Sequence, residues 1–390
     1  MSLPLDVLLV LRAYTELYPP TVNQANLLAE AGLRVGVIDL SADGVNNTLN
    51  PAIRRFRAHR WWNSKTEAPP SLLQRLANQY RFRQTVKTVI REHRPKVVIA
   101  YDILAAAFVP PQPRVHKTVY HFHELPEPDP CEGLGTKTAR TKTAGYARAA
   151  DLIVFSDAMR AKIYQDQIGL PAAAKIVMNC PRRIAQIAVS PLREKLVSLG
   201  FPQAQAVCYL GSIGLDQGIL PAAASMKYWP ADSVFVLVGK CSDEMRQRIL
   251  SRAAEANAEK RILFLGSHPH AEALALIAGG DLGLSLIQPN TENWRHSAGA
   301  INKRFEYMAL GLPQVSSNGP GVAEIIEQGN CGACIDLNNP EAIGQTVRQL
   351  LENNPQRQQF STNARALHLN RYNYETQFAE VLNWIQRAAA

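Results

Sequence analysis

The chain has few cysteines, no long apolar run and no recognisable metal-binding motif, and each absence narrows its function. Six cysteines among 390 residues form no dense disulfide framework and suit a reducing cytoplasm. Cys331 and Cys334 have CxxC spacing, but without a second CxxC we expect packing in a turn instead of zinc or redox chemistry. No stretch reaches the roughly 18 apolar residues of a membrane-spanning helix. We therefore expect a cytoplasmic protein, at most peripheral on the inner face of a membrane.

An α/β architecture follows from short apolar runs that alternate with helical segments. The run Val7 to Val10 has no basic segment before it, so it predicts a buried first strand and not a signal peptide. A chain of 390 residues with 46% hydrophobic content can fill two cores. We predict a first domain over residues 1–195, a second over 196–370 and a last helical segment over 371–390.

Positive charge is concentrated in the first half. Residues 1–200 carry 27 Lys+Arg against 16 Asp+Glu, whereas residues 201–390 carry 15 against 17. The range 54–96 holds twelve of these cations, only two acidic residues and several interleaved aromatic residues, Trp61 and Trp62 among them. Three interpretations stay open: a solvated helix surface, attraction to anionic membrane lipids, or binding of an anionic acceptor. Nucleic-acid binding is not expected, because no recognised module accompanies the charge.

The most informative stretch runs from Asn302 to Ile326 and reads NKRFEYMALGLPQVSSNGPGVAEII. Its pattern predicts a helix, a short strand, a glycine turn and a second helix. Lys303 and Glu306 lie three residues apart near the start of the first helix, so they share one of its faces. A cation there suits a phosphate, and a carboxylate one turn later suits ribose hydroxyls. The alternative is an ordinary surface ion pair.

This stretch resembles the donor-site signature of the retaining glycosyltransferases of family 4 (group 1). The resemblance implies the GT-B fold, in which two Rossmann-like domains with parallel sheets face a central cleft and the last helix crosses back to the first domain. It also implies a nucleotide-sugar donor and transfer in which the leaving phosphate helps to deprotonate the acceptor. The sequence contains no Asp-x-Asp motif and no histidine cluster that demands a metal, so we expect neither a metal nor a cofactor.

A second resembling element, Tyr120-His-Phe-His-Glu-Leu-Pro, follows a predicted strand in the first half. By that match His123 is the active-site histidine that contacts the donor sugar. His121 and Glu124, together with Tyr14 in the loop after the first strand, are expected on the acceptor side. Without the resemblance, a lone histidine at a strand end is more often structural.

The glycine-rich turn after residue 210 departs from the family pattern. The family commonly has arginine and lysine where this chain has Ser212 and Gln217, so two phosphate contacts are missing. The family's first glutamate is replaced by Ala298. We expect other cations, Lys240 or Lys303 with Arg304, to supply the charge. The predicted donor-binding residues are Gly211, Ser212, Gly214, Gln217, Lys240, Ser267, Lys303 and Glu306, with Ser267 lining the base pocket.

These residues predict a metal-independent, retaining glycosyltransferase that moves a sugar from a nucleotide-sugar to a glycan, lipid-linked or small-molecule hydroxyl. The alternative is a GT-B scaffold that binds nucleotide or glycan without turnover, as the departures at Ser212, Gln217 and Ala298 suggest. The prediction depends on Lys303 and His123 facing one crevice. The expected partners are the nucleotide-sugar, the acceptor and an anionic membrane surface at residues 54–96.

Overall fold

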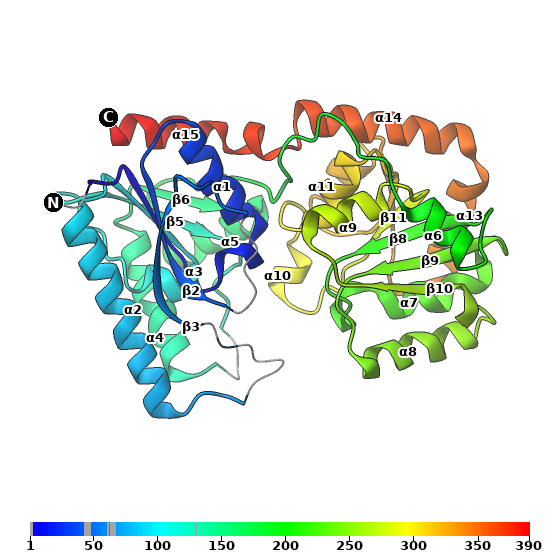
Figure 1. The fold of residues 1–390 in the computed structure, drawn as a ribbon, viewed down its shortest axis with the longest axis horizontal. Coiled ribbons are helices and arrows are strands. Elements are labelled where there is room, and N and C mark those ends of the chain that lie inside the picture. Colours follow the sequence, from blue (N-terminus) through cyan, green and yellow to red (C-terminus); the bar gives the residue numbers. More distant parts are fainter. Residues whose placement is uncertain (1–2, 43–47, 61, 63–67, 129–131) are drawn as a thin grey trace. The chain divides into compact units, whose positions relative to one another are not determined.

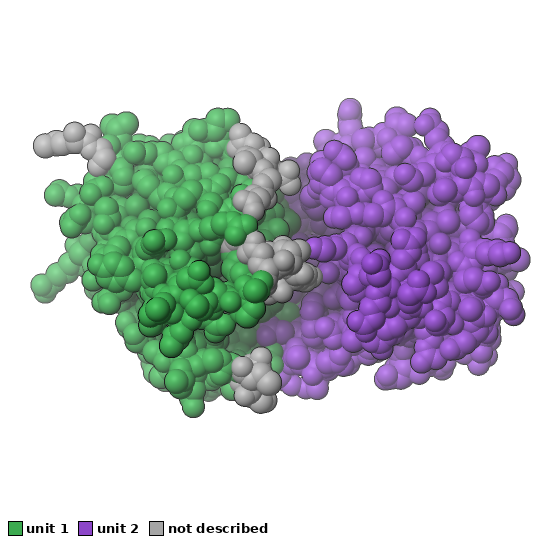
Figure 2. Space-filling view, turned by 60° about the horizontal axis from the view of Figure 1, so that its bottom comes forward, with its two compact units in different colours: residues 1–179, 374–390 green, residues 180–373 purple. Residues whose placement is uncertain are grey.

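The structure is a computed structural model that describes residues 3–42, 48–60, 62, 68–128 and 132–390. Its contacts divide the chain into two compact units, which Figure 2 shows in green and purple. Unit 1 comprises residues 1–179 and 374–390, and unit 2 comprises residues 180–373. Trp61, part of the predicted basic and aromatic region, lies outside the described residues.

Unit 1 is built on a parallel sheet of seven strands in the order β3-β2-β1-β4-β5-β6-β7. The strands are β1 Val7–Val10, β2 Val35–Ser41, β3 Arg54–Arg60, β4 Val97–Tyr101, β5 Lys117–Phe122, β6 Leu152–Phe155 and β7 Lys175–Ile176. This order places the first strand centrally, and the chain then adds strands outward on each side in turn. The carboxyl ends of all seven strands therefore lie along one edge.

Helices cover both faces of this sheet (Figure 1). They are α1 Pro19–Glu30, α2 Leu72–His93, α3 Asp102–Ala106, α4 Leu134–Ala147, α5 Ala158–Ile168 and α15 Tyr374–Ala389. Alternate residues of β1 enter different cores: Val7 and Leu9 pack with Phe378 of α15, whereas Leu8 packs with Phe82 of α2. The strands are apolar on both faces because each face is covered.

Unit 2 repeats this architecture with a parallel sheet of six strands in the order β10-β9-β8-β11-β12-β13. The strands are β8 Gln205–Leu210, β9 Ser233–Val238, β10 Ile262–Gly266, β11 Leu282–Ser285, β12 Gln314–Ser317 and β13 Gly332–Ile335. The helices are α6 Leu192–Ser198, α7 Ile219–Ser225, α8 Asp243–Ala254, α9 His270–Ile277, α10 Glu292–Arg295, α11 Asn302–Ala309, α12 Val322–Ile326, α13 Pro340–Glu352 and α14 Asn354–Asn370.

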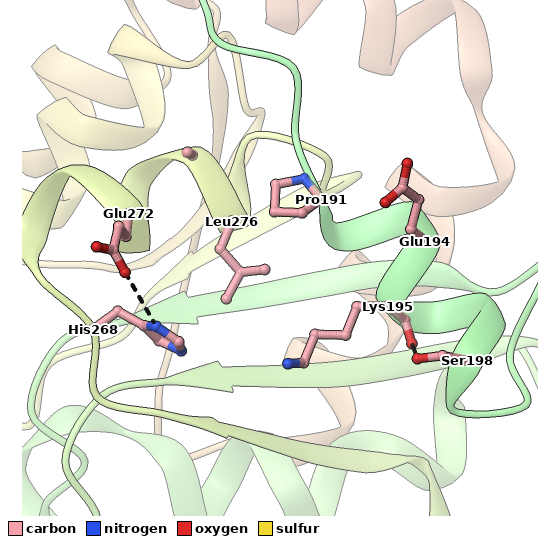
Figure 3. Close-up of a pocket in the computed structure, with 8 residues that line it drawn as sticks. Pro191, Glu194, Lys195, Ser198, His268, Glu272 and Leu276 are labelled. Carbon is pink, nitrogen blue, oxygen red and sulfur yellow. Dashed lines mark hydrogen bonds and ion pairs between the residues drawn. The ribbon is translucent and has the colours of Figure 1, made fainter.

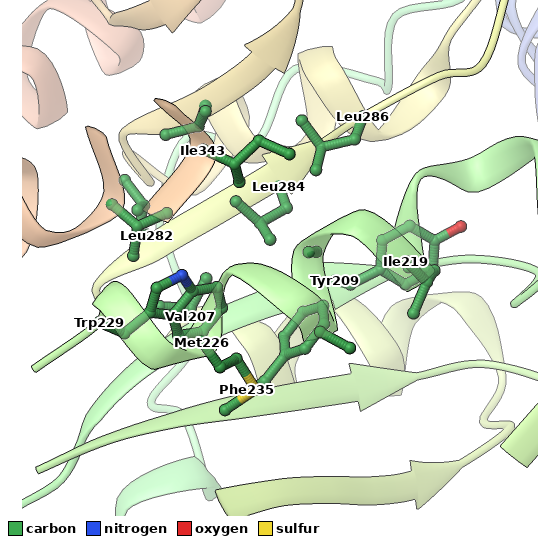
Figure 4. Close-up of a cluster of buried hydrophobic side chains, with 14 of the residues drawn as sticks. Val207, Tyr209, Ile219, Met226, Trp229, Phe235, Leu282, Leu284, Leu286 and Ile343 are labelled. Atoms are coloured by element: carbon green, nitrogen blue, oxygen red, sulfur yellow. The ribbon is translucent and has the colours of Figure 1, made fainter. Parts of the chain in front are cut away.

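One core of unit 2 packs α7 and α13 against the sheet (Figure 4). Phe235 of β9 and Trp229 meet there with ring centroids 5.4 Å apart, and Ile343 of α13 is fully buried. The prediction of two Rossmann-like α/β units is confirmed. Within the described residues, no helix is long and apolar enough to cross a membrane.

Two local features are not apparent from the sequence. Residues 43–70 are mostly polar, yet Arg54–Arg60 forms the edge strand β3, paired in parallel with β2. Its basic side chains leave no apolar run to reveal a strand. Asp102 is the first residue of α3, with φ of 52°, and its carboxylate does not cap the helix but accepts from the backbone N–H of His123.

Candidate functional site

Three neighbouring strands of unit 2, β8, β9 and β10, end at glycines with positive φ: Gly211 at 124°, Gly239 at 153° and Gly266 at 80°. A Cβ atom at Gly239 would lie 1.8 Å from the carbonyl oxygen of Gly211, so no larger residue fits there. The Gly239 N–H in turn donates to the Gly266 carbonyl at 2.8 Å. This edge is therefore backbone without side chains, which allows a phosphate to approach closely.

Lys303 lies against this edge from the first turn of α11. Its Nζ donates to the hydroxyl of Tyr209 at 2.9 Å and to Oε1 of Gln217 at 2.6 Å, and it lies 4.2 Å from the centre of the Tyr209 ring. Gln217 stands where the resembled family has a lysine, and its neutral amide holds Lys303 in place. Because position 217 is a glutamine and not a lysine, Lys303 has two neutral hydrogen-bond partners, Tyr209 and Gln217.

The environment of Lys303 disfavours its charge. The side chain is 8% exposed, and burial lowers the pKa of Lys303 to about 7, against an opposing effect of Glu306. Binding of an anion at the glycine-rich edge would stabilise the charged form of Lys303.

Glu306 is buried one turn along α11, and its Oε1 lies 2.7 Å from Nε2 of His270, the first residue of α9. This hydrogen bond raises the pKa of His270 above its usual value. No sequence pattern pointed to His270, because the contact joins residues 36 positions apart. The second carboxylate oxygen of Glu306 has no hydrogen bond within the described part of the chain, so it can accept one from a ligand hydroxyl.

The other predicted donor residues lie along the same edge. Ser212 and Gly214 belong to the turn after β8, and Lys240 and Ser267 follow Gly239 and Gly266 directly. The Lys240 side chain is exposed, whereas its backbone carbonyl accepts from the Ile213 N–H at 3.0 Å. The structure therefore gathers all eight predicted donor residues at the carboxyl edge of this sheet and at the start of α11.

Arg304, next to Lys303, has a different role. Its guanidinium is fully buried and donates to the carbonyl oxygens of Ser297 and Ala298 at 2.9 and 2.8 Å. These bonds fix the loop before α11 at the position where the family has its first glutamate. Ala298 also packs closely, since a Cβ added at Gly321 would lie 3.2 Å from its own Cβ.

A pocket of about 590 Å³ opens on another part of unit 2, between α6 and α9 (Figure 3). Lys195 and Glu194 line it from α6, and His268 and Glu272 face each other across 3.8 Å on the side of α9. None of the predicted donor residues lines this pocket. This pocket is therefore separate from the edge where β8, β9 and β10 end at glycines.

In unit 1 the corresponding edge carries His123, which follows β5. Its Nδ1 lies 3.1 Å from Oδ2 of Asp102, and its Nε2 lies 3.3 Å from the hydroxyl of Thr21. The carboxylate accepts, so the proton resides on Nδ1, and Nε2 can accept from Thr21 or from a ligand hydroxyl. The side chain of His123 is 7% exposed. Asp102 is therefore the residue that fixes the orientation of this ring.

The His123 ring is also held in place by stacking against other rings. The His123 ring stacks on Tyr101 and His121, with ring centroids 5.3 and 5.1 Å away. The Tyr101 hydroxyl and His121 Nδ1 both donate to Oε1 of Gln24, at 2.8 and 3.0 Å. Burial lowers the pKa of His121 well below its usual value, so this ring stays neutral. His121 therefore supports His123 from inside the protein.

The two remaining acceptor-side residues lie apart from each other within unit 1. Tyr14 is buried after β1, with the guanidinium groups of Arg55 and Arg57 5.9 and 5.4 Å from its ring centre. Glu124 is exposed next to His123, and its backbone N–H lies 3.4 Å from Oδ1 of Asp102. Glu124 is therefore the residue that shares the surroundings of His123, whereas the ring of Tyr14 lies next to two arginines of β3.

Comparisons with known proteins agree with this geometry. Residues 204–367 match the family model described as glycosyl transferases group 1. No curated protein matches the chain in a sequence search. Three similar solved structures are sucrose-phosphate synthase from Thermosynechococcus elongatus (15% identity, TM-score 0.75, 98% of each chain), Anabaena HepE in complex with UDP-glucose (16%, 0.73, 98% and 99%) and WaaG, a glycosyltransferase involved in lipopolysaccharide biosynthesis (16%, 0.67, 97% and 99%).

The family match covers the unit that holds the glycine-ended edge, Lys303 and Glu306, and the structural similarity extends over both units. The resemblance to this family is confirmed for residues 204–367, and the predictions of the fold and of a glycosyltransferase are confirmed. Residues 204–367 thus match the group 1 glycosyl transferases, a retaining family (GT4), and the chain has the GT-B fold.

Proposed function

We propose that this chain transfers a sugar, with retention of configuration and without a metal, from a nucleotide-sugar donor to a hydroxyl of a glycan, a lipid-linked glycan or a small molecule. The observation that carries the proposal is Lys303, a buried cation between Tyr209 and Gln217 at an edge where three strands end in glycine. A diphosphate supplies the negative charge that this environment lacks.

During transfer, charge accumulates on the departing diphosphate. Lys303 and the backbone N–H groups of the turn from Gly211 to Gln217 are held in place before the reaction, so they stabilise that charge without reorganisation. We assign the diphosphate to this turn. The leaving phosphate then accepts the proton of the attacking hydroxyl, which requires no separate nucleophile on the protein.

Glu306 is the proposed ribose ligand. One carboxylate oxygen is held by His270 at 2.7 Å, and the other is left to accept from a ribose hydroxyl. His123 is the proposed ligand of the donor sugar: Asp102 keeps its proton on Nδ1, so Nε2 presents a lone pair to a sugar hydroxyl. Glu124, His121 and Tyr14 stay predictions for the acceptor side.

The donor to test first is UDP-glucose, because the similar HepE structure contains it. Calorimetric titration with UDP, GDP and ADP sugars identifies the base, and nucleotide release with candidate acceptors measures turnover. Glu306→Ala should lower transfer at least tenfold while the fold survives, since it removes a charged acceptor of a hydrogen bond. Glu244→Ala, on the exposed face of α8, is the matched control.

Two results would contradict the proposal. Unchanged kinetics in Glu306→Ala would remove this residue from the donor site. Donor binding without nucleotide release, across the panel of acceptors, would favour the alternative of a scaffold that binds but does not turn over. The predicted contact of residues 54–96 with an anionic membrane stays a prediction here, and residues 61 and 63–67 of that range lie outside the described structure.

A further inference from the structure

Gln24 of α1 is fully buried and binds the two rings on which His123 stacks. Its Oε1 accepts from the Tyr101 hydroxyl at 2.8 Å and from Nδ1 of His121 at 3.0 Å. The ring centroids of Tyr101 and His121 lie 5.3 and 5.1 Å from that of His123. One side-chain oxygen therefore joins both neighbours of the proposed sugar ligand, and the proposed transfer chemistry assigns it no role.

This oxygen is the part of the Gln24 amide that makes hydrogen bonds. Among the described residues, Nε2 of Gln24 and Nε2 of His121 have no hydrogen-bond partner. Tyr101 and His121 are also fully buried, and Gln24 is the side-chain partner of each in the described structure. Without its oxygen, the Tyr101 hydroxyl and Nδ1 of His121 would have neither water nor a protein acceptor, so both rings would move to find one.

The oxygen of Gln24 also determines which nitrogen of His121 carries the proton. A carbonyl oxygen can only accept a hydrogen bond, so it holds the proton of His121 on Nδ1. Asp102 holds the proton of His123 on Nδ1 in the same way, at 3.1 Å. The two imidazole rings, stacked with an interplanar angle of 20°, therefore carry their protons on equivalent nitrogens.

The start of α1 places Gln24 against these rings. Pro19 and Pro20 occupy the first turn of the helix, where a proline needs no helical N–H partner. Thr21 and Gln24 lie three residues apart and therefore share one face of α1. The Thr21 hydroxyl lies 3.3 Å from Nε2 of His123. The same face of α1 thus contacts both stacked histidines.

We propose that Gln24 is a positioning residue for sugar transfer. Its oxygen fixes the rings of Tyr101 and His121, and these rings fix His123 in the orientation that meets the donor sugar. The proposal rests on the role of His123 in the proposed function. Gln24 is buried and acts through other side chains. It affects the rate of transfer and not the binding of UDP, because the proposed diphosphate ligands belong to unit 2.

Two substitutions separate the oxygen of Gln24 from the volume of its side chain. Gln24→Leu removes the acceptor, so kcat with UDP-glucose should fall about 10-fold, while the Kd of UDP should change less than about twofold. Gln24→Glu keeps an accepting oxygen. The carboxylate takes up one proton on burial, on itself or on His121, and in either form an oxygen still faces Nδ1. Its kcat should therefore stay within about threefold of the unaltered chain.

A matched control removes a different buried hydrogen bond of unit 1. Tyr120→Phe deletes the bond from the Tyr120 hydroxyl to the Val109 carbonyl, on the other face of β5. Its kcat should change less than about twofold. Equal losses of kcat in Gln24→Leu and Tyr120→Phe would overturn the proposal, because they would show an effect of stability alone. A loss in Gln24→Leu that Gln24→Glu shares would also overturn it.

Nitrogen NMR of the histidine rings gives a readout that lower stability by itself would not change. The unaltered chain should show the proton of His121 on Nδ1, and Gln24→Leu should shift it toward Nε2. A proton on Nε2 of His121 in the unaltered chain would overturn the proposal. Turnover by the unaltered chain that Gln24→Leu leaves unchanged would overturn the role of Gln24 alone. Absence of turnover in the unaltered chain would instead overturn the proposed function on which that role rests.

Discussion

The two sheets share a topology but end differently at their carboxyl edges. In unit 2, the central strand and its two neighbours on one side, β8, β9 and β10, end at Gly211, Gly239 and Gly266. In unit 1, the neighbouring strands β4 and β5 end beside Tyr101 and His123, whose rings stack 5.3 Å apart. One edge presents bare backbone, and the other presents packed side chains. The same fold can therefore build a phosphate site at one edge and a site for side-chain recognition at the other.

The charged groups of the two edges differ in the same sense. Lys303 has only neutral hydrogen-bond partners, Tyr209 and Gln217. His123 already faces a carboxylate, that of Asp102. A cation whose hydrogen-bond partners are neutral gains most from an anionic ligand, whereas a histidine with a fixed tautomer gains most from a neutral hydroxyl. The edge of unit 2 is thus suited to a diphosphate, and the edge of unit 1 is suited to a neutral hydroxyl.

Replacing Lys303 should have the largest effect on this contrast. Lys303→Met keeps most of the buried volume but removes the cation, so kcat/KM for UDP-glucose should fall at least about 100-fold. Lys240→Met, at an exposed position on the same edge, should cost less than about tenfold. If both variants lose activity equally, the buried position of Lys303 has no special value for donor binding.

Stability against pH gives Lys303→Met a second readout. Burial lowers the pKa of Lys303 to about 7 in the folded chain, whereas an unfolded lysine has its ordinary value of 10.5. Between these values the unfolded state binds more protons, so the free energy of unfolding should rise with pH from about 7 to about 10.5. Lys303→Met should lack this rise. Urea unfolding at several pH values measures this free energy. If it rises equally with pH in both proteins, Lys303 is not the source of the rise.

Adding one methyl group at Gly239 should disrupt the backbone packing at the carboxyl edge of the unit 2 sheet. Gly239→Ala places a Cβ 1.8 Å from the Gly211 carbonyl oxygen at a φ of 153°, so it should lower the free energy of unfolding by at least about 3 kcal/mol. Gly266→Ala meets no atom within 4 Å and should cost only about 1 kcal/mol, from its φ of 80°. Calorimetric unfolding measures both. Similar losses would mean that backbone conformation, and not the close approach, limits position 239.

The side-chain edge of unit 1 should be altered by Asp102→Asn. The amide donates to Nδ1 of His123 instead of accepting, so the proton moves to Nε2 and the ring no longer offers its lone pair to a sugar hydroxyl. We expect kcat to fall about 10- to 50-fold with little change in UDP affinity. Asp166→Asn, on the exposed face of α5, is the control. An equal loss of UDP affinity would mean that Asp102 acts on the fold and not on the ring.

The sequence predicted the parts of this contrast that depend on local pattern. Apolar runs revealed the buried strands, and the spacing of Lys303 and Glu306 placed both on one face of α11. The edge strand β3 escaped because its exposed, basic residues resemble a loop. The partners of the site residues escaped because they are distant in sequence: Gln217 lies 86 positions from Lys303, and His270 lies 36 from Glu306. Such pairs are set by the order of strands in the sheet, which no local pattern contains.

His270 gives the smallest expected effect. Its hydrogen bond to Glu306 raises its pKa, so the charged pair stabilises the fold fully below the ordinary value near 6.5 and loses this effect as pH rises through the raised value. His270→Ala should therefore destabilise the protein more at pH 6 than at pH 8. It should also raise the KM for the donor about threefold, since Glu306 loses the group that orients its carboxylate. His268→Ala, whose ring contacts the Leu265 carbonyl instead, is the control. A lower KM in His270→Ala would reverse the assignment, because it would show that His270 competes with the ribose for Glu306.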